Sequence, residues 1–207
     1  MLVTFEGIEG CGKSTQAWML AEHMRQLGRG VRLSREPGGS SLGSELRGIL
    51  LDGSRELDPR AELFLYLADR AQHVQEVILP ALGAGELVIV DRFVDSTLAY
   101  QGWARGLGLE QALGLSQVAS QGLAPDLTIL LDLDAETSLA RARSRDQSRA
   151  DIREGKFEAQ DLQFHRRVRQ AYLELASSEP ERIRTLDARG EPEQVQEQVL
   201  KALGLAS

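Results

Sequence analysis

The sequence predicts an α/β fold in which a doubly wound, mostly five-stranded parallel sheet carries helices on both faces. Short apolar runs alternate with amphipathic segments along the 207 residues, an order typical of right-handed β-α-β crossovers. Runs such as 87–90 are continuously apolar, as expected for strands that are covered on both faces. The length and the 42% hydrophobic content suit one domain over residues 1–207 with a substantial core.

A glycine-rich segment follows the first predicted strand, residues 2–5, and opens the first predicted helix. Residues 7–14 read GIEGCGKS, the G-x-x-x-x-G-K-[ST] spacing of a phosphate-binding loop (P-loop). Glycines let backbone N–H groups turn inward, and the helix N-terminus adds partial positive charge. We expect Lys13 to reach the β- and γ-phosphates and the Ser14 hydroxyl to bind Mg²⁺. The expected nucleotide-binding residues here are Gly7, Ile8, Glu9, Gly10, Cys11, Gly12, Lys13, Ser14 and Thr15.

The remaining elements follow from hydrophobic periodicity and from terminators. Helices are expected at 13–27, 42–50, 59–79, twice within 95–122 around a break at 106–108, at 135–145, at 164–175 and from 192 onward. Strands are expected at 31–34, 87–90, 127–131 and 183–186. Pro37 and the paired glycines after it force a loop between the second strand and the second helix, which carries Arg47.

The third predicted helix contains an arginine within its apolar stripe. Arg70 follows Tyr66 by four residues, so both side chains share one face of the helix. An inward arginine is costly unless it has partners. An aromatic ring beside a fork of donors would suit a stacked, hydrogen-bonded heterocycle. The pattern fits equally well an arginine that is paired with a buried acid or that extends to the surface.

Asp91 and Arg92 directly follow the apolar run 87–90. In open α/β sheets ligands bind beyond the carboxyl ends of the strands, so this pair is expected to face the same crevice as the phosphate-binding loop. Asp91 is placed to act on the Mg²⁺ shell, and Arg92 to hold a second phosphate. A purely structural Asp–Arg pair is the alternative interpretation.

A basic stretch runs from Arg141 to Lys156 in a chain whose net charge is −7. Its position between two helices predicts an Arg-rich lid over about 143–158, a cationic cover that excludes water from the transferred phosphate. A solvated charged face is the ordinary interpretation of such a run.

The net charge, the length of the apolar runs and the number of cysteines exclude several classes of protein. The net charge of −7 argues against a protein that coats nucleic acid. No run of 18 apolar residues and no export signal is found, so we expect a cytoplasmic protein without a membrane span. Cys11 is the only cysteine, which rules out internal disulfides, and we interpret it as a small residue that fits the loop rather than a reactive thiol. The three histidines lack ligand spacing and are interpreted as surface or packing residues.

A loop of this kind occurs in kinases, switch GTPases and motor ATPases. The third strand continues as DRFV rather than D-x-x-G, and no N-K-x-D segment is present, which disfavours a switch GTPase. A small kinase remains.

Five segments, taken together, resemble the bacterial thymidylate kinases, a family of P-loop nucleoside monophosphate kinases. They are the loop 7–14, REPGG at 35–39, LADRAQ at 67–72, DRF at 91–93 and STLAYQG at 96–102. The resemblance covers nearly the whole chain. It implies Mg²⁺-dependent transfer of the γ-phosphate of ATP to dTMP, giving dTDP and ADP, by a cytoplasmic homodimer. The rival hypotheses are a kinase for another nucleoside monophosphate or small metabolite and a non-catalytic nucleotide-binding regulator.

The resemblance also implies roles for individual residues. The expected catalytic residues are Lys13, Asp91, Arg92 and Arg149, with Ser14 and Asp91 at the metal and Arg145 at ATP. For the substrate it implies that Arg70 bonds the thymine ring, Tyr66 stacks on it, Thr97 and Gln101 contact the base edge, Arg92 and Arg47 hold the monophosphate, Tyr100 lies near the sugar, and Glu36 belongs to the same site.

Two departures from the family pattern affect the assignment of these roles. Tyr66 stands where the family commonly has phenylalanine, and its hydroxyl needs a partner. The lid carries what looks like a short insertion, so the clamp is expected to be Arg149, with Arg153 and Lys156 as alternatives.

Overall fold

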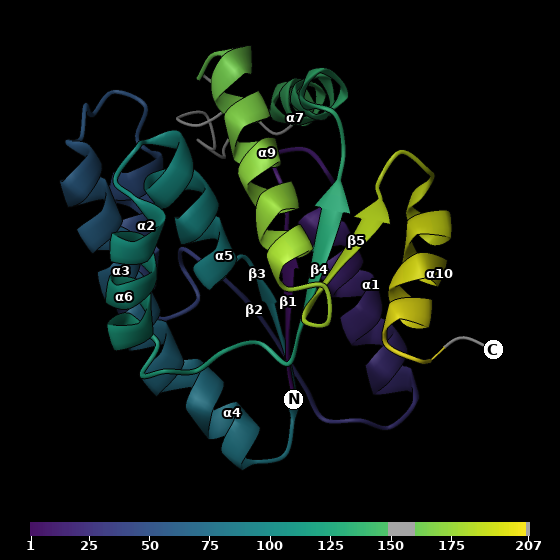
Figure 1. Ribbon diagram of the computed structural model, residues 1–207. Helices are drawn as coiled ribbons and strands as arrows, with labels where there is room; N and C mark the ends of the chain where they lie inside the picture. Colours follow the sequence, from purple (N-terminus) through teal and green to yellow (C-terminus); the bar gives the residue numbers. More distant parts are fainter. Residues whose placement is uncertain (149–159, 206–207) are drawn as a thin grey trace.

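The computed structural model describes residues 1–148 and 160–205, the side chains of 145–148 excepted. Its centre is one five-stranded, all-parallel sheet with the strand order β2-β3-β1-β4-β5 (Figure 1). The strands are β1 (Leu2–Glu6), β2 (Val31–Arg35), β3 (Leu87–Asp91), β4 (Leu127–Asp132) and β5 (Ile183–Asp187). All five lie where the sequence predicted strands.

The helical segments connect the strands and cover both faces of the sheet. They are α1 (Lys13–Gln26), α2 (Ser41–Leu51), α3 (Pro59–His73), η1 (Val74–Ile78), α4 (Leu79–Gly83), α5 (Val94–Thr97), η2 (Leu98–Ala104), α6 (Leu109–Ala119), α7 (Ala135–Ser148), α9 (Leu162–Ser178) and α10 (Pro192–Ala202). None of the helices in the described part of the chain is both long and apolar enough to cross a membrane. The doubly wound fold is confirmed.

Alternate residues of the central strands pack on opposite sides of the sheet, because successive side chains of a strand point to opposite faces. Phe5 and Ile129 pack with α1 and α10 on one face. On the other face Val88 and Val90 pack against Ile78 of η1. With both faces covered, β1 is buried throughout and forms a rigid base for the loop that comes after it.

The third predicted helix differs from the expectation in its second half. It begins at Pro59, with the Asp58 side chain accepting from the Arg60 amide at its start, as the Asp-Pro pair predicted. After His73 it continues as the π-helical segment η1 and then as α4, which ends at Gly83 rather than near 79. A π-helical turn adds a residue and rotates the helix beyond it, and the periodicity of the apolar residues did not reveal this turn.

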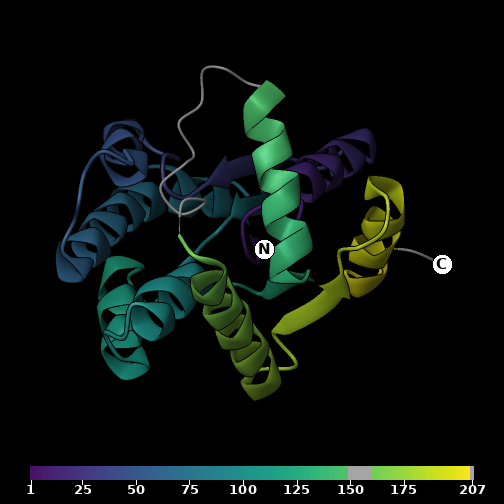
Figure 2. The same cartoon turned by 90° about the horizontal axis from the view of Figure 1, so that it is seen from above.

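Strand register brings three strand ends to one edge of the sheet. Phe5 of β1 and Arg35 of β2 both lie opposite Asp91 of β3. The residues after these strands therefore meet beyond a single edge, the usual ligand position in open α/β sheets. Helix α7 lies beyond the same end of β4, and Figure 2 looks down on this side of the molecule.

Candidate active site

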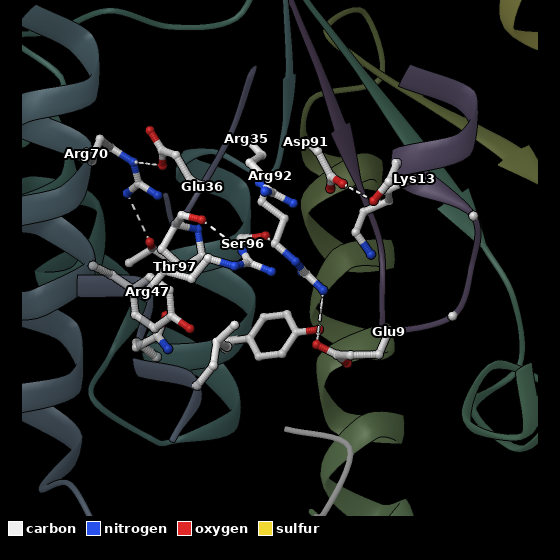
Figure 3. A pocket seen from close by; sticks show the side chains of 18 residues that line it. Glu9, Lys13, Arg35, Glu36, Arg47, Arg70, Asp91, Arg92, Ser96 and Thr97 are labelled. Atoms are coloured by element: carbon white, nitrogen blue, oxygen red, sulfur yellow. Dashed lines mark hydrogen bonds and ion pairs between the residues drawn. The ribbon is translucent and has the colours of Figure 1, made fainter. Parts of the chain in front are cut away.

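A cleft at this edge of the sheet is lined by 18 residues, drawn in Figure 3. From the phosphate-binding loop and α1 it takes Glu9, Gly10, Gly12, Lys13 and Ser14. From the other predicted site residues it takes Glu36, Arg47, Tyr66, Arg70, Asp91, Arg92, Thr97, Tyr100 and Gln101. The cleft thus brings together residues that lie up to about half the chain apart.

The lining of the cleft differs from the prediction at eight residues, four of them predicted loop residues that do not line it and four of them unpredicted residues that do. Gly7, Ile8, Cys11 and Thr15 do not line the cleft, and of these Gly7, Ile8 and Cys11 are buried. Arg35, Pro37, Leu51 and Ser96 line it although they were not among the predicted site residues.

The glycines of the loop are required where the backbone is in close contact with its surroundings. A Cβ on Gly10, whose φ is +82°, would lie 2.0 Å from the Ser138 carbonyl oxygen of α7. A Cβ on Gly7 would lie 2.6 Å from the carbonyl oxygen of Leu131. The Ser138 hydroxyl also donates to the Glu9 carbonyl at 2.5 Å. The loop is therefore fixed between β4 and α7.

Lys13 and Ser14 begin α1 at the floor of the cleft. The Lys13 ammonium group donates to the Ile8 carbonyl at 2.8 Å, which holds the side chain along the loop. The Ser14 hydroxyl donates to the Asp91 carboxylate. Serine and carboxylate oxygens side by side at a phosphate-binding loop are a donor set that fits Mg²⁺, which binds one or two protein oxygens and completes its shell with water and phosphate. Among the described residues no group of three or more acidic, histidine or cysteine side chains forms a metal site.

Arg92 has a left-handed backbone conformation, φ +72°, which is uncommon for a residue with a long side chain and is typical of strained functional positions. The Arg92 amide is held by the Phe5 carbonyl at 3.0 Å. Its guanidinium donates to Glu9 at 3.0 Å, to Ser96 at 3.1 Å and to the Tyr100 hydroxyl at 3.3 Å. The guanidinium consequently points along the loop into the cleft (Figure 3).

Glu9 is the counter-charge of Arg92. Burial raises the pKa of its carboxyl group, but Arg92 and then His165 outweigh burial and hold that pKa well below its ordinary value. Tyr100 also donates to Glu9, at 2.7 Å. Glu9 is therefore ionised and ties the loop to Arg92.

A buried acid that the sequence analysis missed, Glu6, binds Ser96 and Tyr172, and both of these also bind Arg92. Glu6, at the end of β1, is 0% exposed and accepts from the Phe93 amide at 2.7 Å, from Ser96 at 2.6 Å and from Tyr172 at 2.9 Å. Burial and the nearby Asp95 raise the pKa of Glu6 to about 7. The signal available in the sequence was an acid that ends a buried apolar strand at the ligand-binding edge.

Arg70 is 1% exposed and sits within a set of fixed partners. It donates to Glu36 at 2.9 Å, to Thr97 at 2.9 Å and to the Phe93 carbonyl at 2.8 Å. His73 holds the other oxygen of Glu36 at 2.9 Å. The pairing with a buried acid is thus confirmed and extension to the surface is excluded. Because Arg70 also lines the cleft, a contact with a heterocycle stays a prediction.

The other predicted substrate residues surround this arginine. Tyr66 lines the cleft, and burial, followed by Glu62, raises the pKa of its hydroxyl, so the ring is neutral. Arg47 lines the cleft and donates to the Pro37 carbonyl at 2.8 Å. Gln101 is 2% exposed and donates to Glu62 at 3.0 Å. Glu62 is a second acid that the sequence analysis missed.

The predicted lid falls largely outside the described residues. Arg149, Arg153 and Lys156 lie outside them, and so does the side chain of Arg145. At the described start of the basic stretch, Arg141 donates to the carbonyls of Ala188 and Arg189 at 2.9 and 3.0 Å. The lid and its clamp therefore stay predictions.

Comparisons with known proteins agree on one family. The family model described as thymidylate kinase matches residues 5–199. A thymidylate kinase of Solidesulfovibrio magneticus is 52% identical over 206 residues, 99% of each chain. One of Desulfovibrio desulfuricans is 54% identical over 197 residues, 94% of this chain and 91% of that protein. The crystal structure of thymidylate kinase from Ehrlichia chaffeensis superposes with a TM-score of 0.80 at 31% identity, covering 99% of this chain and 98% of that one.

Proposed function

This chain belongs to the thymidylate kinase family, and we propose that its cleft transfers the γ-phosphate of ATP to dTMP with the help of Mg²⁺. One observation carries the proposal. The phosphate-binding loop, Arg92 and Arg70 line one continuous cleft, so a donor phosphate, an acceptor phosphate and a base fit within a single site. A kinase for another acceptor and a non-catalytic regulator are not favoured by the family match.

The donor side consists of the loop and the start of α1. Backbone N–H groups at this helix N-terminus attract phosphate, and Lys13 adds a full positive charge. Ser14 and Asp91 would hold Mg²⁺, which supplies a charge that neutralises the transferring phosphoryl group. Arg145 would complete the contacts to ATP, and Arg149, or else Arg153 or Lys156, would clamp the transferred group from a lid over about 143–158.

The acceptor side consists of Arg92 and Arg47 at the phosphate, Tyr100 at the sugar, and Arg70, Tyr66, Thr97 and Gln101 at the base, with Glu36 holding Arg70. In this scheme the acceptor phosphate oxygen attacks directly, without a covalent enzyme intermediate. Phosphoryl transfer depends on positioning and on cations where charge develops. Arg92 lies between the loop and the acceptor side, where it meets that requirement.

We also propose that the protein is a cytoplasmic homodimer. Large apolar side chains on two neighbouring helices support a contact between copies: Phe64 of α3 is 57% exposed, and Leu113 and Val118 of α6 are 41% and 78% exposed. Sedimentation equilibrium of the wild type beside Val118→Glu tests this. A monomeric wild type would contradict it.

A coupled assay of ADP release with a panel of nucleoside monophosphates tests the reaction. We expect dTMP to give the highest kcat/KM and EDTA to abolish turnover. Preference for another monophosphate would indicate a different acceptor. ATP binding without turnover on any acceptor would indicate a regulator.

A further inference from the structure

Glu62 lies outside the cleft lining but controls a residue inside it. It belongs to the first turn of α3, and it is 1% exposed. Its Oε1 accepts from Gln101 Nε2 at 3.0 Å and from Arg105 Nε at 3.3 Å, while its Oε2 accepts from Arg105 at 3.3 Å. A two-point contact with arginine fixes the plane of the carboxylate.

Backbone geometry explains how both partners reach this one acid. Gln101 lies in the π-helical segment η2, and Arg105 ends it, with its amide bonded to the Tyr100 carbonyl at 2.9 Å. π-Helical turns are frequent at functional sites. Here the turn places Gln101 and Arg105 on the side of η2 that packs against α3.

The bond to Glu62 determines which end of the Gln101 amide faces the cleft. An ionised carboxylate only accepts hydrogen bonds, so it pairs with the NH₂ end of an amide. The carbonyl oxygen of Gln101 is then the end left for the cleft, which Gln101 lines. Within the described part of the chain, no hydrogen bond engages that oxygen.

The cleft consequently offers a donor and an acceptor of fixed identity. Arg70 donates to Glu36, Thr97, Ser116 and the Phe93 carbonyl, which leaves one guanidinium N–H as the donor. Gln101 supplies a carbonyl oxygen. A thymine or uracil ring carries the complementary pair, a carbonyl oxygen beside a ring N–H. Cytosine carries the opposite pair, an amino group beside an unprotonated ring nitrogen, which would leave both protein groups facing a like partner.

We propose that Glu62 is a specificity-determining positioning residue, which fixes the Gln101 amide with its oxygen toward the cleft and thereby excludes cytosine nucleotides. This inference rests on the proposed function, since it assumes that the base of the acceptor lies beside Arg70 and Gln101. The bond to Glu62 is then the reason why Gln101 accepts a hydrogen bond from the base and does not donate one.

The experiment compares dTMP with 5-methyl-dCMP, which keeps the methyl group, sugar and phosphate and differs only at positions 3 and 4 of the ring. Glu62→Gln keeps the shape of the side chain but can donate or accept, so the Gln101 amide is free to turn over. We expect the ratio of kcat/KM for dTMP to that for 5-methyl-dCMP to fall by about tenfold or more. The matched control is Glu22→Gln, which removes an arginine-paired acid at the exposed surface of α1 and should keep the wild-type ratio.

A second substitution separates positioning from general damage. In a Gln101→Leu background the amide is absent, so adding Glu62→Gln should no longer change the ratio. An unchanged ratio in folded Glu62→Gln, or an equal fall in both backgrounds, would overturn the inference.

Two further measurements keep the inference testable. If Glu62→Gln does not fold, a neutron crystal structure of the wild type with dTMP decides, because neutrons distinguish the amide nitrogen from the oxygen. Gln101 Nε2 within 3.5 Å of Glu62 supports the inference, and Nε2 turned toward the ring overturns it. If the wild type does not phosphorylate dTMP, the proposed function fails. The ratio of the two Kd values, measured by calorimetry, then tests Glu62 separately, because an equal ratio in wild type and Glu62→Gln overturns its role.

Discussion

The part of the cleft around Arg70, where we propose that the base binds, and the part around Arg92, where we propose that phosphate binds, hold their arginines in different ways. Arg70 projects from a regular helix, its side chain is 2% exposed, and Glu36, Thr97 and a backbone carbonyl fix it. Arg92 occupies a single left-handed residue after β3, its side chain is 18% exposed, and its charged partner belongs to the phosphate-binding loop.

Under the proposed function, this difference corresponds to the difference between recognising a base and assisting phosphoryl transfer. A buried guanidinium with several fixed partners keeps one orientation, which suits reading a base. A more exposed guanidinium whose partners include Glu9 and the hydroxyls of Ser96 and Tyr100 can exchange them for phosphate oxygens. Interactions made mainly in the transition state raise turnover, whereas interactions made equally with bound substrate lower KM.

The largest effect is expected from Arg92→Ala. Removing a cation at the transferring phosphate should reduce kcat by about a thousandfold or more, with little change in the circular-dichroism spectrum. Arg92→Lys, which keeps the charge without the fork, serves as the control and should recover part of the loss. Near-normal turnover of folded Arg92→Ala would remove the proposed role and with it the distinction between the two sides.

Arg70→Ala should act on binding and on stability together. The loss of the base contact is expected to raise the KM for dTMP by about a hundredfold. Glu36 would keep His73 but lose its buried arginine partner, which should cost about 3–5 kcal/mol in the free energy of unfolding. The double variant Arg70→Met with Glu36→Gln is the control, because it removes both charges and should recover much of the stability. An unaltered KM would show that Arg70 does not contact the base.

Glu6, whose carboxyl group interacts with Arg92, is expected to make the stability of the protein depend on pH. The pKa of Glu6 is raised from 4.5 to about 7, so between these values the folded protein binds more protons than the unfolded chain. The contribution of Glu6 to the free energy of unfolding is therefore fully present below about pH 4.5. It decreases by about 3 kcal/mol as the pH rises through 7. Glu6→Gln has no such titration. Urea unfolding at pH 5 and pH 8 should show a smaller loss of stability for the variant, and equal losses would contradict this assignment. Asp95, Arg92 and Tyr172 are the ionisable neighbours that set the pKa.

The smallest effect is expected from Asp91→Asn. An amide at this position weakens the oxygen pair formed with Ser14, and the Mg²⁺ concentration for half-maximal activity should rise by about tenfold. The KM for dTMP measured at saturating Mg²⁺ should stay near its wild-type value. A wild-type Mg²⁺ dependence would move the metal site elsewhere.

The sequence predicted well those features that local patterns determine. Apolar runs located the central strands, weaker patterns located the strands at 31–34 and 183–186, and the glycine spacing located the loop beside Lys13. The conflict between Arg70 and its apolar stripe identified a buried residue that lines the cleft, although the pattern alone did not separate its possible partners. The π-helical turn after His73 escaped prediction because it depends on hydrogen bonds rather than on residue type.

The supporting acids were missed for a different reason. Glu6 contacts Tyr172, which lies 166 residues away, and Glu62 contacts Gln101 across 39 residues. No periodicity connects such pairs, since the fold alone brings them together. The clamp expected at Arg149 stays a prediction, because it falls outside the part of the chain that the structure describes.

The contact between Gly10 and Ser138 couples two parts of the protein mechanically. With no space for even a methyl group at Gly10, and with the serine hydroxyl anchored on Glu9, the loop cannot shift unless α7 shifts with it. That helix leads directly into the segment expected to cover the nucleotide. A displacement of the loop would thus reach α7 directly, through the Ser138 backbone and hydroxyl, without an intervening chain of residues.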